Sequence, residues 1–130
     1  MSPTAADVAE GLYARWNDNE LDVLTDAVDP DVELICDPLR PVESALRGIA
    51  GWKHWVARWN DSYERMHITI DGLIPMSAEH VLAFVSITAT PRGRRRPLTW
   101  AAAHVWTVRN GRIARWEPHV DLDLARGTLL

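Results

Sequence analysis

The segment from His104 to Asp121 constrains the fold more than any other part of the sequence. It contains two alternating runs that are typical of strands, with the dipeptide Asn110-Gly111 between them. This dipeptide favours a two-residue turn of the primed type, and such a turn fixes the register of the strands that it joins. The segment therefore predicts a hairpin in which Arg109 lies opposite Arg112.

The predicted register determines which side chains share a face of the hairpin. Counting outward from the turn, one face is expected to combine tryptophans with charged and imidazole groups, and the other is expected to be small and apolar. The pairs expected on the first face are Val108 with Ile113, Trp106 with Arg115, His104 with Glu117, Ala102 with His119 and Trp100 with Asp121. Because Pro118 has no N–H, a bulge near it is conceivable, and a bulge would exchange the faces beyond it.

The remaining sequence predicts helices first and long strands afterwards. Thr4 and Asp7 form a capping pair that opens a first helix, and a second short helix is expected to end at Asp29-Pro30. A strand, a proline-containing loop and a third helix follow, and strands fill the rest of the chain. The expected ranges are 31–37 for the first strand, 49–63 for the third helix, and 66–70, 79–90, 98–108 and 112–121 for the later strands. This order predicts one α+β domain, residues 1–130, with helices on one face of a curved antiparallel sheet.

The composition narrows the possible partners and compartments. A formal charge of −4 argues against nucleic acid as the main partner. Cys36 is the single cysteine, so a reducing compartment such as the cytoplasm is expected. The N-terminus lacks the features of a secretion signal, and no apolar segment approaches the ~20 residues that cross a bilayer, so no membrane association is expected. Seven tryptophans against one phenylalanine indicate a surface that grips small molecules or subunits.

Four segments, taken in order, resemble the nuclear-transport-factor-2-like superfamily, and within it the branch of SnoaL-like polyketide cyclases and ketosteroid isomerases. They are "YARWNDNELDVL", "DPDVELICDP", "LRGIAGWKHW" and "HVWTVRNGRIARW", and they span nearly the whole chain. The resemblance implies a cone-shaped, cystatin-like α+β barrel with the N-terminal helices packed on the concave face of the sheet and a deep apolar cavity between them. It also implies a homodimer that forms through the sheet.

The resemblance further implies two catalytic residues. The segment "CDP" is similar to the end of the first strand in ketosteroid isomerases, where the aspartate shuttles protons, and this position is Asp37. An acidic residue of the isomerases, which donates to the substrate oxyanion, matches His104, two positions before Trp106. The sequence departs from the family at two other positions. The isomerase tyrosine of the first helix matches Leu12, with Tyr13 one place further on. The His-x-Asp pattern of the cyclases is replaced by Trp116 and Pro118.

Other side chains are expected to line the pocket and to hold a small apolar or aromatic ligand. They are Tyr13, Trp16, Trp59, Trp106, Trp116, Glu117, His119 and Asp121. Each candidate also has a purely structural interpretation: Asp37 as the cap of a turn, His104 as a buried hydrogen-bonding group, and the polar hairpin face as a solvated or dimer surface. No metal is expected, because His104, Glu117 and His119 are not supported by an established ligand spacing.

These observations predict a cofactor-independent isomerase, cyclase or lyase. Asp37 would move a proton from a carbon next to a carbonyl, and His104 would stabilise the developing enolate oxygen. No cofactor is expected, since the substrate carbonyl accepts the electrons. The alternative is a non-catalytic dimeric module that binds an apolar metabolite or pairs subunits. An epoxide hydrolase is a third possibility, which needs a carboxylate and an arginine around one water.

Overall fold

The computed structural model describes residues 4–21 and 25–119 of the 130-residue chain. The N-terminal half contains α1 (Ala5–Asn17), the 3₁₀ turn η2 (Thr25–Ala27), β1 (Val28–Ile35), α2 (Pro41–Ser44), β2 (Ala45–Arg47) and α3 (Gly48–Ser62). The C-terminal half contains β3 (Tyr63–Pro75), β4 (His80–Pro91), β5 (Leu98–Arg109) and β6 (Arg112–His119). Helices therefore precede a run of long strands, which confirms the predicted α+β order. No helix in residues 4–21 or 25–119 is long and apolar enough to span a membrane.

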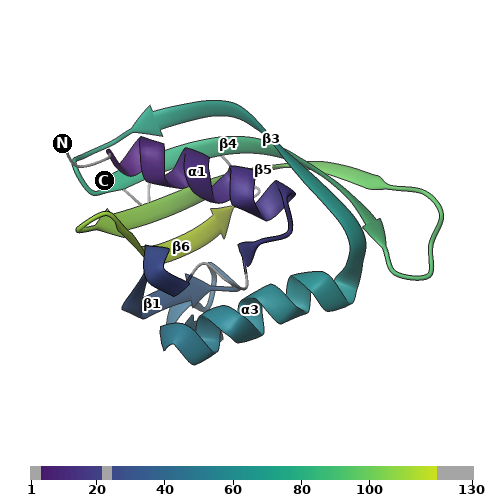
Figure 1. The fold of residues 1–130 in the computed structure, drawn as a ribbon, viewed down its shortest axis with the longest axis horizontal. Coiled ribbons are helices and arrows are strands. Elements are labelled where there is room, and N and C mark those ends of the chain that lie inside the picture. The colour runs from purple at the N-terminus through teal and green to yellow at the C-terminus, as the bar shows by residue number, and fades with distance from the viewer. Residues whose placement is uncertain (1–3, 22–24, 120–130) are drawn as a thin grey trace.

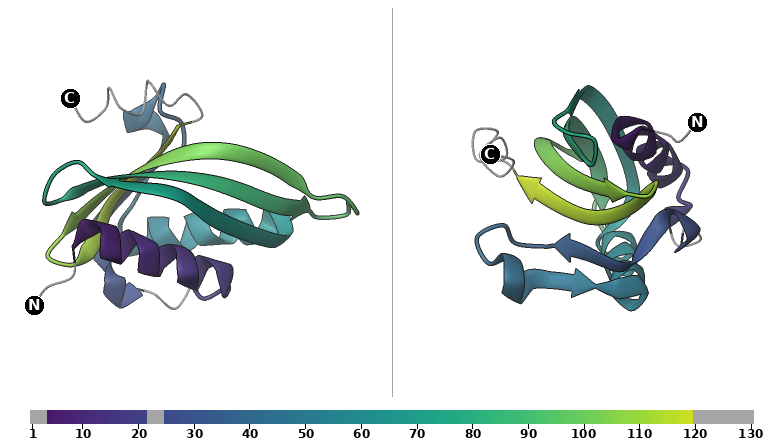
Figure 2. Two further views of the ribbon diagram at one scale, coloured as in Figure 1. Left: turned by 90° about the horizontal axis from the view of Figure 1, so that it is seen from above. Right: turned by 90° about the vertical axis from the view of Figure 1, so that its left-hand side faces the viewer.

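The six strands form one curved sheet that does not close into a barrel (Figure 1). Their order is β2-β1-β6-β5-β4-β3, and neighbouring strands are antiparallel except for the parallel pair of β1 and β6. Helices α1 and α3 both lie on the concave side of the sheet (Figure 2), where the Trp16 ring of α1 contacts the Trp55 and Trp59 rings of α3. The predicted placement of the N-terminal helices is thus confirmed.

Helix α1 begins at the predicted capping pair. The backbone N–H of Asp7 donates to the Thr4 hydroxyl at 3.1 Å, and the backbone N–H of Thr4 donates to the Asp7 carboxylate at 3.2 Å. The buried face of the helix carries Ala5, Ala9, Leu12, Tyr13 and Trp16. At the end of the helix, the Asn17 side chain accepts from the N–H of Ile68 at 2.7 Å and donates to its carbonyl at 2.8 Å. Ile68 lies on the edge strand β3, so Asn17 takes the place of a neighbouring strand there.

The prediction of a second helix that ends at Asp29-Pro30 is wrong. Val28 does not end a helix but opens β1, where it pairs with Ile113 and is 2% exposed. A buried β-branched residue suits a strand better than the end of a helix. Pro30 is tolerated in β1 because it lies between Val28 and Glu33, where the ladder with β6 shifts register. The prediction had Leu21, Leu24 and Val28 facing inward from this helix, and Leu24 lies outside the described residues.

The proline-containing loop before α3 contains secondary structure of its own. Residues 41–44 form the short helix α2, and β2 pairs with β1 through Glu33–Arg47, Leu34–Leu46 and Ile35–Ala45. Helix α3 packs so closely on β2 that a Cβ added at Gly51 would lie only 2.8 Å from the carbonyl carbon of Leu46. This contact fixes α3 under the first strand and so positions one wall of the cavity described below.

The last hairpin has the predicted turn but not the predicted register. Asn110 and Gly111 have φ angles of 53° and 75°, as a primed turn requires, and Arg109 pairs with Arg112 and Val108 with Ile113. Ala114 is then an extra residue on β6. The following pairs are Thr107 with Arg115, Trp106 with Trp116, Val105 with Glu117, His104 with Pro118 and Ala103 with His119. The bulge thus lies at Ala114 and not near Pro118.

The bulge follows from the burial of two apolar side chains at an odd spacing. Ile113 and Trp116 are three residues apart, yet both belong to the core on the concave face of the sheet. Successive side chains of a regular strand alternate between faces, so residues three apart would lie on opposite sides. The extra residue resolves this conflict and moves every later side chain of β6 to the face opposite to the predicted one.

Candidate functional site

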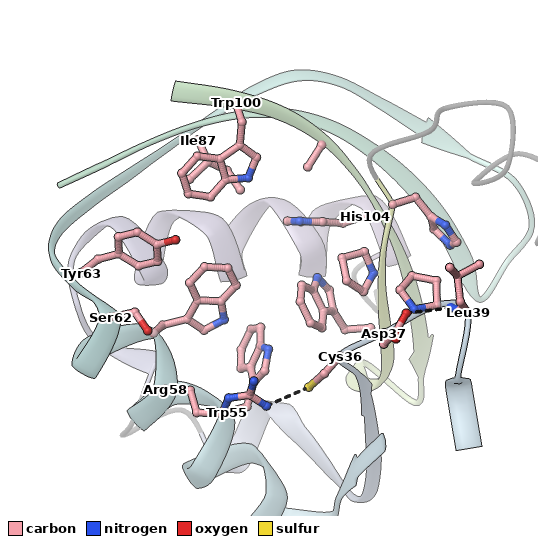
Figure 3. A pocket seen from close by; sticks show the side chains of 16 residues that line it. Cys36, Asp37, Leu39, Trp55, Arg58, Ser62, Tyr63, Ile87, Trp100 and His104 are labelled. Atoms are coloured by element: carbon pink, nitrogen blue, oxygen red, sulfur yellow. Dashed lines mark hydrogen bonds between the residues drawn. The ribbon is translucent and has the colours of Figure 1, made fainter. Parts of the chain in front are cut away.

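A cavity of about 580 Å³ lies between α3, the end of β1 and the concave face of β4, β5 and β6 (Figure 3). Its lining residues are Cys36, Asp37, Pro38, Leu39, Trp55, Arg58, Trp59, Ser62, Tyr63, Ile87, Trp100, Ala102, His104, Trp116, Pro118 and His119. Most of these side chains are apolar or aromatic, and a few convergent polar groups lie among them. Small-molecule sites have this combination of apolar walls and few polar groups.

One face of α3 forms a wall of the cavity. Trp55, Arg58, Trp59 and Ser62 recur at the spacing of a helical stripe and all line the cavity. Trp55 is 2% exposed and Trp59 is half-buried, so the stripe changes from core to cavity wall along the helix. Only Trp59 of these four was predicted to contact a ligand.

Alternate side chains of strand β5 form the opposite wall of the cavity. Trp100, Ala102 and His104 point to the same concave face and line the cavity. Trp106 continues this row, but its indole N–H donates to the Tyr13 hydroxyl of α1. Trp106 is buried in the core and does not line the cavity.

His104 is held by a chain of two buried hydrogen bonds. Its Nδ1 lies 2.7 Å from the Tyr13 hydroxyl oxygen, which accepts from Trp106 Nε1 at 2.8 Å. An indole N–H can only donate, so the one hydrogen of the Tyr13 hydroxyl remains for His104 Nδ1. Nδ1 of His104 therefore accepts, the ring proton lies on Nε2, and this N–H is the polar group that His104 offers to the cavity.

Burial keeps both members of this pair uncharged. Burial, and to a lesser extent the charge of His119, lowers the pKa of His104 to about 3. Burial also raises the pKa of Tyr13 above its ordinary value, against a smaller lowering by the hydrogen bond from Trp106. At neutral pH the His104 imidazole at the cavity is therefore uncharged, and its proton lies on Nε2.

Asp37 lies in the loop that follows β1, and it lines the same cavity as His104. Its Oδ1 accepts from the backbone N–H of Leu39 at 3.0 Å, and its own N–H donates to the Ser44 hydroxyl at 2.9 Å. The two residues predicted to be catalytic thus line one cavity, although they lie 67 positions apart in the chain. The hydrogen bond to Leu39 also matches the structural interpretation of Asp37 as the cap of a turn.

The predicted pairing of His104 with Glu117 is wrong, because the bulge at Ala114 moves Glu117 to the other face of the sheet. Glu117 pairs with Val105, and its carboxylate lies 3.4 Å from both Arg115 Nη1 and His119 Nε2. Tyr13, rather than a carboxylate, orients the imidazole of His104. His119, the last residue of β6, still contributes to the cavity lining.

The other predicted ligand-binding residues divide into two groups. Trp59 and Trp116 line the cavity, whereas Tyr13, Trp16, Trp106 and Glu117 do not. Trp16 and Tyr13 pack behind His104, with ring centroids 6.4 and 5.9 Å from its imidazole. Asp121 lies outside the described residues.

Two indole N–H groups beside the cavity have no hydrogen-bond partner among the described residues. They belong to Trp55 and Trp116, whose rings pack edge to face with centroids 4.8 Å apart.

The sequence-based prediction missed Arg58 and Cys36, which lie together at the cavity. Nη1 of Arg58 donates to Cys36 Sγ at 3.6 Å. Burial raises the pKa of the Cys36 thiol, and the nearby Arg58 partly opposes this rise. The helical spacing of Arg58 with Trp55 and Trp59 could have identified it as a lining residue. Within residues 4–21 and 25–119, no group of three His, Cys, Asp or Glu side chains is arranged to hold a metal ion.

Known proteins share this fold at low sequence identity. An NTF2-like protein of unknown function from Burkholderia pseudomallei is 21% identical, with a TM-score of 0.75 over 94% of this chain and 95% of its own. A SnoaL-like polyketide cyclase from Agrobacterium tumefaciens is 17% identical, with a TM-score of 0.73 over 98% and 99% of the two chains. A Mycobacterium tuberculosis protein in complex with estradiol-17beta-hemisuccinate is 13% identical, with a TM-score of 0.76 over 93% and 97%.

The sequence itself carries the family assignment. A search of curated proteins found no match. The family model of the SnoaL-like domain, however, matches residues 9–116 and so covers most of the chain. The chain therefore belongs to the SnoaL-like family.

Proposed function

We propose that the protein is a cofactor-independent acid/base enzyme, an isomerase, cyclase or lyase, that acts on an apolar carbonyl compound bound in the cavity. The observation that carries the proposal is the neutral His104, which is fixed by Tyr13 so that its Nε2–H faces an aromatic-walled cavity. A fixed donor in an apolar site stabilises negative charge that develops on a substrate oxygen, and it needs no reorganisation during the reaction.

Asp37 is the proposed base. Its carboxylate removes a proton from the carbon next to the carbonyl, and the electrons of the C–H bond form a C=C bond. The electrons of the carbonyl π bond move to oxygen, where the Nε2–H of His104 donates a hydrogen bond to the enolate. In a β,γ-unsaturated ketone, return of the proton from Asp37 to the γ-carbon of the dienolate completes an isomerisation. Attack of the enolate carbon on a second carbonyl, followed by transfer of the proton from Asp37 to the alkoxide that forms, completes a cyclisation.

Known relatives support a small-molecule ligand of this kind. One similar structure is a complex with estradiol-17beta-hemisuccinate, and another protein of similar structure was co-crystallised with polyporic acid. The volume of about 580 Å³ lies within the usual range for small-molecule sites, and four tryptophans and a tyrosine provide flat apolar faces around it. Trp59, Tyr63 and Trp100 form a continuous aromatic row, with centroid separations of 5.9 Å between successive rings.

A hydrogen-exchange assay tests the proposed proton transfer without knowledge of the natural substrate. Apolar ketones of increasing size, beginning with 2-tetralone, are incubated with the protein in D₂O, and loss of the α-proton signal is followed by NMR. We expect the wild type to accelerate exchange and Asp37→Asn to reduce the enzymatic rate by about 10²-fold or more, because general base catalysis typically contributes 10²–10⁴-fold. Ligand affinity, measured by quenching of tryptophan fluorescence, is expected to change by less than about twofold.

Asp31→Asn is the matched control for this assay. Asp31 lies on β1, is exposed, and undergoes the same chemical change away from the cavity. This variant is expected to keep the wild-type exchange rate. Equal exchange rates in the wild type and Asp37→Asn, for ketones that bind both proteins, would rule out Asp37 as the base.

A second candidate function is ligand binding without catalysis. It is favoured by the hydrogen bond between Asp37 Oδ1 and the N–H of Leu39, since this contact gives the carboxylate a structural role in the loop. In that case the ketones bind and quench tryptophan fluorescence, but no protein-dependent exchange occurs.

The proposal includes a homodimer that forms through the sheet in the cytoplasm. It is supported by the resemblance to SnoaL-like proteins and by the single, half-buried Cys36, which suits a reducing compartment. Light scattering is expected to give twice the chain mass of 14.7 kDa at micromolar concentration. A mass of one chain over the whole concentration range would remove the dimer from the proposal.

A further inference from the structure

The guanidinium of Arg58 lines the cavity without a carboxylate partner among the described residues. The ion pairs of the described chain are Arg15–Glu20, Arg47–Glu33, Arg109–Glu79, Arg115–Glu117 and His119–Glu117, and none includes Arg58. Its side-chain hydrogen bond goes to Cys36 Sγ, at 3.6 Å. Sulfur is a weak acceptor, so the five N–H donors of the guanidinium are largely unused.

Cys36 does not neutralise the charge of Arg58. Burial raises the pKa of the thiol, so Cys36 is protonated and uncharged at neutral pH. Two acidic residues lie near Arg58 in the sequence or at the cavity: Asp61, three residues further along α3, and Asp37, next to Cys36. Neither forms an ion pair with Arg58 within 4.0 Å, and the Asp37 carboxylate bonds to the N–H of Leu39 instead. In Figure 3 Arg58 reaches toward Cys36, whereas Asp37 turns toward Leu39.

Arg58 also lies next to the aromatic wall of the cavity. Trp55 precedes it by three residues and Trp59 follows it directly, and all three side chains line the cavity. A ring system that packs on these tryptophans would therefore have the guanidinium at one end and the His104 imidazole elsewhere along the wall (Figure 3). The planar guanidinium fork matches a carboxylate in a bidentate arrangement.

We propose that Arg58 selects ligands that carry an acidic substituent, a carboxylate or a group of similar charge, on an apolar ring body. This inference rests on the proposed function, because it assumes that the cavity binds an apolar small molecule. It adds a substrate class to that function: aromatic or polycyclic acids rather than neutral ketones alone. Arg58 is exposed at the cavity, so the attraction acts across partly solvated space and gives a moderate preference.

The test compares two ligands that differ in charge but hardly in shape, anthracene-9-carboxylate and 9-anthracenemethanol. Their dissociation constants are measured by fluorescence for the wild type, Arg58→Gln, Arg58→Lys and Arg94→Gln. Arg94→Gln is the matched control, because it removes the same charge from the exposed β4–β5 connection, outside the cavity.

The wild type is expected to bind the carboxylate about five- to tenfold more tightly than the alcohol, and this preference is expected to weaken as salt is added. Arg58→Gln is expected to abolish the preference and leave the affinity for the alcohol within about twofold, whereas Arg94→Gln keeps the preference. Arg58→Lys is expected to retain part of it, because the charge remains and the fork is lost.

The outcomes separate this inference from the proposed function. If both ligands bind with equal affinity, or if Arg58→Gln and Arg94→Gln reduce the preference equally, the assignment to Arg58 is overturned and the cavity remains a small-molecule site. If neither ligand binds the wild type, the cavity does not accept apolar ring compounds, and both the inference and the proposed function are overturned.

Discussion

The free energy of unfolding is expected to fall steeply as the pH is lowered from about 6.5 to 4, because His104 is fully buried and uncharged. Its pKa is about 3 in the folded protein and about 6.5 in the unfolded chain, so between these values the unfolded chain binds one more proton. The stabilisation is complete above pH 6.5 and is lost toward pH 3. Over the whole interval it amounts to roughly 4 kcal/mol, with a slope of at most about 1.4 kcal/mol per pH unit.

Urea denaturation at several pH values measures this slope. In His104→Gln the titrating group is absent and the amide oxygen can still accept from Tyr13, so the dependence between pH 6.5 and 4 is expected to be flatter by up to about 1.4 kcal/mol per pH unit. His54→Gln, which removes an exposed histidine of α3, is expected to keep the wild-type slope. If His104→Gln and the wild type lose stability in parallel, His104 is not held neutral by burial.

Replacing Tyr13 by phenylalanine is expected to destabilise the protein by about 2–4 kcal/mol. The hydroxyl is the hydrogen-bond partner of both His104 Nδ1 and Trp106 Nε1, and all three residues are at most 1% exposed. Its loss leaves a buried acceptor and a buried donor unpaired, and each unpaired group costs about 1–3 kcal/mol. Thermal and urea denaturation of Tyr13→Phe measure the effect directly.

Tyr63→Phe provides a matched control, because it removes the hydroxyl of a half-buried tyrosine at the cavity. No hydrogen bond links that hydroxyl to another described residue, so a loss below about 1 kcal/mol is expected. Ligand affinity is also expected to differ between the two variants. Tyr13→Phe frees the His104 ring to change tautomer, whereas Tyr63→Phe does not. Similar losses of stability in both variants would contradict the central role of the Tyr13 hydroxyl.

The sequence was a good guide to features that depend on neighbouring residues. The capping pair of Thr4 and Asp7 and the turn at Asn110-Gly111 follow from local hydrogen bonds and backbone conformation, and both are present. The order of helices and strands also follows from periodicity along the chain. That order also predicted helices on one face of a curved sheet, and the resemblance to the SnoaL-like family added that this face is the concave one.

The features that depend on packing between distant segments were not predictable in the same way. The observed register beyond Val108 differs from the predicted one because both Ile113 and Trp116 enter the core. That both side chains belong to the core can be recognised only once the concave face of the sheet is identified. The hydrogen bond between Tyr13 and His104 joins residues 91 positions apart. No local pattern distinguishes it from the predicted partnership of His104 with Glu117, which depended on a regular ladder.

The candidate site shows the same division. Asp37 and His104 were identified from the resemblance, and both line the cavity. Arg58 was missed, because a single arginine in a helix is usually solvated, and its place at the cavity depends on how α3 packs on the sheet. Its helical neighbours Trp55 and Trp59 were visible in the sequence as an apolar stripe, but a stripe alone does not separate core from cavity wall.

The extra residue on β6 separates the curvature of the hairpin from its pairing register, two properties that usually change together. Deleting Ala114 would leave every cross-strand pair from Arg115 onward with its present partner, since only the unpaired position disappears. The local bend and twist that a bulge imposes would be lost with it. Related chains could therefore enlarge or narrow the cavity by gaining or losing one residue at this position. That residue does not line the cavity, so the chemical groups on the cavity walls stay the same.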